Sequence, residues 1–312
     1  MIKRPTVLIL GAGASAPFGF PPGRKLLGDI CRGLSREAAR FFTLLRECGF
    51  DASTIAAFRD ALKQSGRPSV DVFLEYRPEF LELGKTAIAA SLIAYEIEDK
   101  LLEVKGNWYG YLFQRLGPSL LGDVAQSRLS VITFNYDRSL DHFLFLALKN
   151  AFNLKSHEAV RFLKKIPIVH VYGTLGELPH VGRGGTRPYR RSDPARTVTD
   201  ALAAKDSIKI VPEGVEGDVD FGRALRLLGE AEVVCFLGFG YLRDNVERLG
   251  LERRTAGTRL WGSAYAVGEG AREPIMTLFR GDPNKQPIRL GAANQDALEF
   301  LTRHPILVNR SG

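Results

Sequence analysis

Short apolar runs alternate with amphipathic stretches along most of the chain, and glycine or polar residues follow nearly every run. Runs rich in valine, isoleucine and aromatic residues predict buried strands. These runs cover residues 6–10, 129–134, 166–172, 208–212, 232–237, 259–267 and 288–290. Apolar positions at helical spacing predict helices over residues 24–34, 138–150, 221–228 and 295–303. Strands that alternate with helices are typical of an α/β fold with a doubly wound, mainly parallel, Rossmann-like sheet.

Two stretches depart from this alternation. Residues 35–124 carry apolar side chains at helical spacing and show no alternating strand pattern, which predicts a helical subdomain. Residues 176–206 are rich in glycine, proline and arginine and are expected to form a loop. We therefore expect one domain, with a core built from 1–34 and 125–312 and a helical insertion at 35–124.

Composition places the chain among ordinary globular proteins, because apolar residues make up 45% of its 312 residues and charged residues 25%. No apolar run approaches the ~20 residues that cross a bilayer. Residues 1–5 lead directly into the first strand, which leaves no signal peptide and predicts a cytoplasmic protein. The cysteines, Cys31, Cys48 and Cys235, lie far apart without a C-x-x-C pair. This spacing excludes a four-thiolate zinc site, and no metal is expected.

The formal net charge is +8. Part of this excess is local, because five arginines crowd the loop-like segment at 183–196: Arg183, Arg187, Arg190, Arg191 and Arg196. Such a segment is either a basic surface loop or a contact with the phosphates of a nucleotide or nucleic acid. The charge by itself does not choose between these two interpretations.

Candidate chemistry gathers where the predicted strands end. Gly11 and Gly13 follow the first strand, where glycines allow a sharp turn and close approach to a ligand. Amides at the start of the next helix would then face a phosphate. Later strands end near Asn135, His170 and Gly238. Because ligands of open parallel sheets bind beyond the carboxyl ends of the strands, these groups are expected at one rim.

The motifs at these positions resemble those of sirtuins and bacterial SIR2-like proteins. Residues 11–21 read G-A-G-A-S-x3-G-F-P, which resembles the NAD-binding opening of sirtuins. Residues 133–137 read T-F-N-Y-D, similar to the T-x-N-Y-D segment of bacterial SIR2-like proteins. Residues 172–175, Y-G-T-L, stand where the family has H-G-S-L, and 237–240, L-G-F-G, resemble its later nucleotide turn. These motifs occur in the family's order from residue 6 to about 303.

One departure from the sirtuin pattern indicates the branch of the family. The chain has no cysteine between residues 48 and 235, where sirtuin deacylases carry a four-cysteine zinc module. The resemblance therefore implies an NAD glycohydrolase of the kind that acts as an effector in bacterial anti-phage defence by abortive infection. NAD would be its substrate, and the products would be nicotinamide and ADP-ribose or a cyclised form. Because uncontrolled loss of NAD kills the host, a sensor protein encoded nearby or a homo-oligomer is expected to restrain it.

The catalytic candidates are Asn135, His170 and Tyr172. An asparagine amide both donates and accepts, so Asn135 is expected to orient the ribose and a water molecule. His170 is a candidate base, and Tyr172, at the position of the family's histidine, a candidate ribose ligand. Side chains at i and i+2 of a strand share a face, which would bring His170 and Tyr172 into one pocket. Ordinary structural roles remain open, namely a helix cap for Asn135 and an interior histidine for His170.

The resemblance implies that a further set of residues binds NAD. This set is Gly11, Ala12, Gly13, Ser15, Pro21, Asp137, Gly173, Glu213, Gly238, Asp244 and Asn245. Asp244 and Asn245 are expected to hold the adenosine ribose, and Asp137 is alternatively a helix cap. Residues 71–75 also resemble the family and are expected to serve packing. Two rival functions stay open: a non-catalytic module that binds NAD or ADP-ribose, and a nucleic-acid-associated component of a defence complex.

Overall fold

The computed structural model describes residues 1–117, 121–181, 186–191, 193–210, 218–251, 257–280 and 286–308. Within these residues six strands form one all-parallel sheet in the order β3-β2-β1-β4-β5-β6. The strands are β1 (Thr6–Leu10), β2 (Leu129–Thr133), β3 (Ile168–His170), β4 (Val233–Leu237), β5 (Arg259–Gly262) and β6 (Arg289–Leu290). This order is that of the Rossmann fold, in which the chain adds strands on one side of β1 and then, from β4 onward, on the other side. The predicted fold class is confirmed.

The register brings the carboxyl ends of the central strands level with one another. Leu10 at the end of β1 pairs with Thr133 of β2 on one side and Leu237 of β4 on the other. Thr133 pairs in turn with His170, the last residue of β3. The segments that follow β1, β2, β3 and β4 therefore begin at one edge of the sheet.

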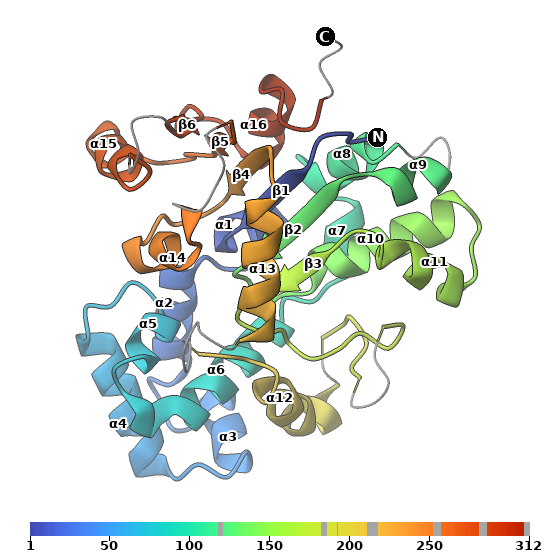
Figure 1. Cartoon of the computed structure of the whole chain (residues 1–312). Coiled ribbons are helices and arrows are strands. Elements are labelled where there is room, and N and C mark those ends of the chain that lie inside the picture. The colour runs from blue at the N-terminus through green and yellow to red at the C-terminus, as the bar shows by residue number, and fades with distance from the viewer. Residues whose placement is uncertain are drawn as a thin grey trace.

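Helices cover both faces of the sheet. One face packs against α13 (Val219–Gly229), α14 (Arg243–Arg248) and α15 (Glu269–Thr277), and α13 crosses in front of the strands in Figure 1. The other face packs against α8 (Trp108–Arg115), α10 (Ser139–Ala151), α11 (Ser156–Leu163) and α16 (Ala297–Arg303). Because β1 and β4 are covered on both faces, every residue of these two strands is buried.

The insertion at 35–124 is helical throughout its described residues. It contains α3 (Arg40–Glu47), α4 (Ala52–Gln64), α5 (Val70–Leu74), η2 (Pro78–Phe80), α6 (Leu81–Ile93), α7 (Asp99–Leu102), α8 and α9 (Leu121–Gln126). In Figure 1, α3 to α6 gather with α2 (Gly23–Gly33) and α12 (Thr197–Lys205) into a helical body below the sheet. The same buried cluster contains Phe58 and Ile88 of this body and Leu8 and Val131 of the sheet, so the packing is continuous.

Several expected elements have different bounds. The supposed loop at 176–206 contains η3 (Pro194–Arg196) and α12, an alanine-containing helix that packs on α6. The expected strand at 208–212 is wrong in its described part, where Ile208 makes only an isolated antiparallel bridge to Gly173. The strands expected at 166–172 and 259–267 are shorter, because each chain turns away at the sheet edge after His170 and Gly262. Helices α11, α14 and α15 had no counterpart in the sequence prediction.

No helix among the described residues is long and apolar enough to cross a membrane. The three cysteines are free thiols. Within the described part of the chain, no group of three histidine, cysteine or acidic side chains is arranged to hold a metal ion.

Candidate functional site

The turns after β1 and β4 touch through their backbones. The Gly11 N–H donates to the Leu237 carbonyl at 3.0 Å, and the Gly13 N–H donates to the Gly238 carbonyl at 2.9 Å. A Cβ added to Gly11 would lie 2.6 Å from the Gly238 oxygen, and one added to Gly13 would lie 2.8 Å from the Gly238 Cα. Glycine is therefore required at both positions because any larger side chain would prevent the two turns from approaching each other this closely. The Gly13 amide is already bonded and is not available to a phosphate in this arrangement, whereas the expectation for the other amides at the start of the helix stays a prediction.

A cavity of about 550 Å³ opens beside these touching turns, among the segments that follow β1, β4 and β5. Gly13 and Gly238 line it, and the segment after β5 and the start of α16 contribute polar groups, Ser263 and Asp296. The Ser263 hydroxyl accepts the Gly238 N–H at 2.9 Å, and Asp296 accepts the Glu299 N–H at 2.9 Å at the start of α16. The remaining lining is mostly apolar: Ala16, Pro17, Pro22, Phe239, Tyr265, Ala266, Val267 and Ala297.

A second cavity of about 80 Å³ lies on the other side of α1 (Ala12–Ser15). Ala12 and Pro21 line it from the first turn, Asn135 and Asp137 from the end of β2, and Asp71 from α5. The other lining residues are Phe20, Gly23, Leu26, Leu92, Phe134 and Tyr136. Since Gly13 lines the larger cavity and its neighbour Ala12 the smaller one, the two cavities flank a single turn.

Asn135 is fixed against that turn. Its amide nitrogen Nδ2 donates to the Gly11 carbonyl at 3.0 Å and to the Ser15 hydroxyl at 3.1 Å. Its backbone N–H donates to Thr133 Oγ1 at 3.1 Å. No donor among the described residues reaches the side-chain oxygen Oδ1, although the residue is only 8% exposed. That oxygen is therefore the atom that Asn135 offers to a ligand hydroxyl or to water.

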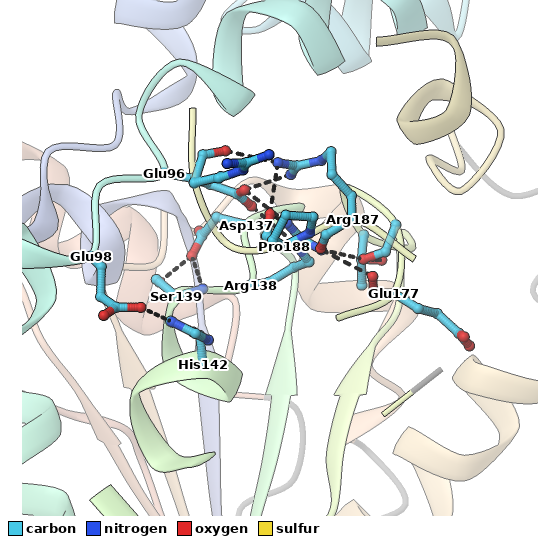
Figure 2. A network of polar contacts seen from close by, with 12 residues as sticks. Glu96, Glu98, Asp137, Arg138, Ser139, His142, Glu177, Arg187 and Pro188 are labelled. Atoms are coloured by element: carbon cyan, nitrogen blue, oxygen red, sulfur yellow. Dashed lines mark hydrogen bonds and ion pairs between the residues drawn. The ribbon is translucent and has the colours of Figure 1, made fainter. Parts of the chain in front are cut away.

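Asp137 lines the same cavity but also holds the start of α10. Its Oδ1 accepts the Ser139 N–H at 3.1 Å and the Ser139 hydroxyl, as Figure 2 shows. Burial raises the pKa of Asp137, although hydrogen bonds from Ser139 and Ser15 oppose that rise. Asp137 thus holds the start of α10 from the position before the N-cap residue, Arg138, and is not itself the N-cap. Ser15 is a buried partner of Asp137.

His170 donates from both ring nitrogens. Nδ1 lies 3.1 Å from the Asn135 carbonyl oxygen, and Nε2 lies 3.1 Å from Asp141 Oδ2 on α10. Both partners are acceptors, so this geometry favours the doubly protonated ring. Burial favours the neutral ring, but the Asp141 carboxylate outweighs it and raises the pKa of His170. In this arrangement His170 has no lone pair for a base and instead ties the Asn135 segment to α10.

Tyr172 belongs to a different set of contacts. Its hydroxyl donates to Asn245 Oδ1 at 3.0 Å and accepts from Arg248 Nη1 at 3.0 Å, both on α14. Arg248 Nη1 also lies 3.7 Å from Glu75 Oε1. Because β3 ends at His170, strand alternation does not extend to Tyr172. The expected shared pocket of His170 and Tyr172 is therefore wrong, and neither residue lines either cavity.

The structure thus separates the predicted site residues into groups. Ala12, Gly13, Pro21, Asn135, Asp137 and Gly238 line the two cavities, and Gly11 and Ser15 support them from behind. Gly173 has φ +74° and packs against Ser207, Asn245 binds Tyr172, and Asp244 is exposed. Neither Asp244 nor Asn245 lines either cavity, so the expectation that they hold an adenosine ribose gains no support from these contacts and stays a prediction. Glu213 lies outside the described residues.

Sequence reasoning missed three polar residues of the cavities: Asp71, Ser263 and Asp296. Ser263 directly follows β5, so the rule of strand ends was a signal for it. Asp71 belongs to the stretch 71–75 that was assigned to packing, and only the fold reveals that it meets the end of β2. Asp296 begins a predicted helix, which is also an ordinary position for a cap.

A buried ion triad stands behind the smaller cavity. The Glu96 carboxylate accepts hydrogen bonds from Arg138 Nε at 3.0 Å and Nη2 at 2.8 Å, and from Arg187 Nη2 at 2.5 Å (Figure 2). The side chains are 0%, 2% and 6% exposed respectively, so all three charges are desolvated. Arg138 Nη1 also donates to the carbonyls of Gly176 and Arg187. Through Arg138 the triad holds residues 176–177 and 187–188 at the start of α10.

The other described arginines of the 183–196 segment also have partners within the chain. Arg190 pairs with Asp193 at 3.1 Å, Arg191 Nε donates to the Ala94 carbonyl at 2.8 Å, and Arg196 lies 3.7 Å from Asp200. Arg183 lies outside the described residues. These contacts give the segment a structural role and leave the nucleic-acid interpretation without support from geometry.

The insertion also supports the first turn directly. The Trp108 indole N–H of α8 donates to the Ala14 carbonyl at 2.8 Å, and the Tyr109 ring stacks on Phe18 with centroids 3.8 Å apart. Tyr109 also shares a hydrogen bond of 2.7 Å with Ser139. The turn between the two cavities is therefore braced by α8 from inside the molecule.

A scan against protein-family models finds no match to this chain, and a search of curated proteins finds no significant relative. The motifs and the two cavities that they line are therefore the features of this chain that bear on its function.

Proposed function

We propose that this chain is a SIR2-like NAD⁺ glycohydrolase, which cleaves the bond between nicotinamide and ribose to give nicotinamide and ADP-ribose. The observation that carries the proposal is the pair of cavities on either side of the α1 turn, with Asn135 in the wall of the smaller one. The pair lies at the point where the strand order reverses, which is where sheets of this topology bind dinucleotides.

In this proposal the dinucleotide spans the α1 turn. The adenosine half enters the larger, mostly apolar cavity, where Ser263 and Asp296 are available to its hydroxyls. The ribose that carries nicotinamide meets the smaller cavity, whose volume of about 80 Å³ admits more than one water molecule. NAD therefore acts as a substrate, and the proposed reaction requires no metal ion.

The reaction requires the protein to position the ribose and a water molecule and to stabilise the positive charge that develops. Nicotinamide leaves as a neutral molecule, so its departure requires no general acid, and the ribose passes through an oxocarbenium-like state. Asn135 Oδ1 accepts a hydrogen bond from a ribose hydroxyl or from the attacking water, and its Nδ2 contacts hold it in place. His170 acts here as a positioning residue, because it anchors the Asn135 carbonyl.

The resemblance to anti-phage effectors supplies the biological part of the proposal. An enzyme that depletes NAD requires restraint, so a sensor partner or self-association gates it until infection. The protein acts in the cytoplasm, where NAD is consumed.

One observation favours a second candidate, a regulatory module that binds NAD or ADP-ribose without turnover. Both His170 nitrogens are occupied, and Tyr172 stands where the family has its histidine. Binding without turnover under every activating condition would favour this module over the hydrolase.

The test compares Asn135→Ala with Asn150→Ala in bacteria that carry the neighbouring genes, with and without phage. Asn150 is exposed near the end of α10 and bonds only the Leu146 carbonyl among the contacts described for its side chain, so it is a matched control. Cellular NAD is expected to collapse on infection with the wild type and with Asn150→Ala. Asn135→Ala is expected to slow nicotinamide release about 100-fold or more.

Asn135→Asp keeps the size of the side chain and its acceptor oxygen but removes the Nδ2 donor, so it separates loss of the contacts with Gly11 and Ser15 from loss of Oδ1. Melting temperatures report folding separately from activity. Undiminished NAD loss with a folded Asn135→Ala variant would refute the proposal.

A further inference from the structure

The smaller cavity contains a carboxylate to which the proposed function has assigned no task. Asp71 lies in the first turn of α5, whose N-cap Ser69 accepts the Val72 N–H at 3.4 Å. Val70, Phe73 and Leu74 bury α5 in the core. This anchoring brings Asp71 into the lining that also contains Ala12 and Asn135, so a side chain of the insertion meets the end of β2.

Asp71 has no cationic partner among the described residues. Its hydrogen bonds come from the Ser69 hydroxyl, at 2.9 Å, and from its own backbone. Glu75, one turn later, differs because it faces Arg248 at 3.7 Å. Burial raises the pKa of Asp71, whose side chain is half-buried and faces no compensating charge among the described residues. Such a group is costly to keep, and groups of this kind concentrate at functional sites.

The other ionisable groups nearby are already engaged. Asp137 Oδ1 accepts two hydrogen bonds from Ser139. His170 donates from both nitrogens, and the Tyr172 hydroxyl is held by Asn245 and Arg248. Asp71 is thus the carboxylate of this cavity that remains available to a ligand with positive charge.

We propose that Asp71 is a catalytic carboxylate that faces the nicotinamide ribose, offsets its positive charge and accepts the proton of the attacking water. This inference rests on the proposed NAD⁺ hydrolysis. The substrate class is a cationic N-glycoside, because the ring nitrogen of oxidised nicotinamide carries the positive charge that the carboxylate would meet.

The bond between C1′ and the nicotinamide nitrogen breaks, and its electron pair leaves with nicotinamide, which becomes neutral. C1′ acquires the positive charge, which the Asp71 carboxylate stabilises. The water oxygen then bonds to C1′, and its proton passes to Asp71 and on to solvent. The sum is NAD⁺ and water to nicotinamide, ADP-ribose and a proton.

The experiment compares Asp71→Asn and Asp71→Glu with Glu79→Gln, an exposed acid of η2 that pairs with Arg77. Nicotinamide release is followed in the activated full-length protein, and dissociation constants are measured for NAD⁺, NADH and ADP-ribose. Asp71→Asn, which keeps the side-chain size, is expected to lower kcat about 100-fold or more. Asp71→Glu is expected to recover part of that loss, and Glu79→Gln to behave as wild type.

Binding supplies a second readout that does not require turnover. Asp71→Asn is expected to weaken NAD⁺ about tenfold relative to NADH, because only the oxidised ring is cationic, and to leave ADP-ribose within twofold. Melting temperatures confirm that each variant is folded. A kcat within threefold of wild type for Asp71→Asn overturns the inference and leaves the hydrolase standing. A wild type that never releases nicotinamide refutes the proposed function. If, in addition, Asp71→Asn leaves the ratio of NAD⁺ to NADH affinity unchanged, Asp71 does not interact with the positive charge of the ring.

Discussion

Gly238 illustrates how a single residue sets the geometry of the candidate site. Its φ is +57°, and a Cβ there would lie 1.9 Å from the Ala14 nitrogen. The same residue accepts the Gly13 N–H and donates to Ser263. Both backbone conformation and space therefore require glycine, and the requirement concerns contact between two turns.

This requirement leads to a paired substitution. Gly238→Ala is expected to destabilise the fold by about 3 kcal/mol, because it combines backbone strain with overlap against α1. Gly240→Ala, two residues later, is expected to have little effect, since no atom lies within 4 Å of its added Cβ. Urea unfolding of both variants measures the difference. Equal midpoints for the two variants would contradict this account.

The sequence was sufficient at the residue scale where a group directly follows a strand. Ala12 follows β1, Asn135 follows β2, and both line the smaller cavity. The sequence was insufficient where a role depends on a distant partner, because His170 is hydrogen-bonded to Asp141 and Tyr172 to Asn245. No local pattern specifies a hydrogen bond between elements that are far apart in the chain.

Among the elements, the buried central strands were predictable because their apolar runs have no helical alternative of sufficient length. The errors occur where tertiary packing decides. Helix α12 follows a segment rich in arginine and proline, but its Ala201 and Ala204 are buried in a helix that packs on α6. The edge strand β3 ends early, because within the described residues only β2 lies beside it to bond its backbone.

Two histidines join α10 to the segment that crosses it. His142 stacks on Tyr189 with centroids 4.6 Å apart, and its Nε2 lies 2.7 Å from Glu98. His180 stacks on Phe145 with centroids 3.5 Å apart. Burial lowers the pKa of both rings, that of His180 to about 4. His142 Nδ1 and His180 Nε2 have no hydrogen-bond partner among the residues that the structure describes. The packing therefore suits neutral rings.

These pKa shifts predict acid sensitivity. A histidine pKa lowered in the folded state contributes stability above the unfolded value near 6.5, and that stability is lost as the pH falls from about 6.5 to about 4. The melting temperature of the wild type is expected to fall across this range. The melting temperature of His180→Phe is expected to fall less over this pH range. That of His157→Gln, on the exposed part of α11, should follow the wild type. Identical profiles for His180→Phe and wild type would remove His180 from the explanation.

For the whole molecule, the Glu96 triad connects three distant parts of the chain. Glu96 follows α6 in the insertion, Arg138 precedes α10 in the core, and Arg187 belongs to the segment that crosses it. The buried cluster around them likewise includes residues from the insertion and from the sheet. Such continuity fits the expectation of one domain, which stays a prediction.

Glu96→Gln is expected to destabilise the whole protein by roughly 3–5 kcal/mol, because it leaves two buried guanidinium groups without a counter-charge. Asp193→Asn breaks the exposed pair with Arg190 and is expected to change stability by less than about 1 kcal/mol. Urea unfolding followed by circular dichroism compares them. A small effect of Glu96→Gln would mean that water or a nearby acid relieves the two arginines.

The bond from Trp108 to the Ala14 carbonyl gives the molecule a built-in optical signal. An indole emits at a wavelength that follows the polarity and hydrogen bonding of its N–H, and this N–H is joined to the turn that separates the two cavities. A dinucleotide that shifts the turn would therefore change the emission of Trp108 without any label. The chain's other tryptophan, Trp261 on β5, lies beside His304 and provides an internal reference within the same spectrum.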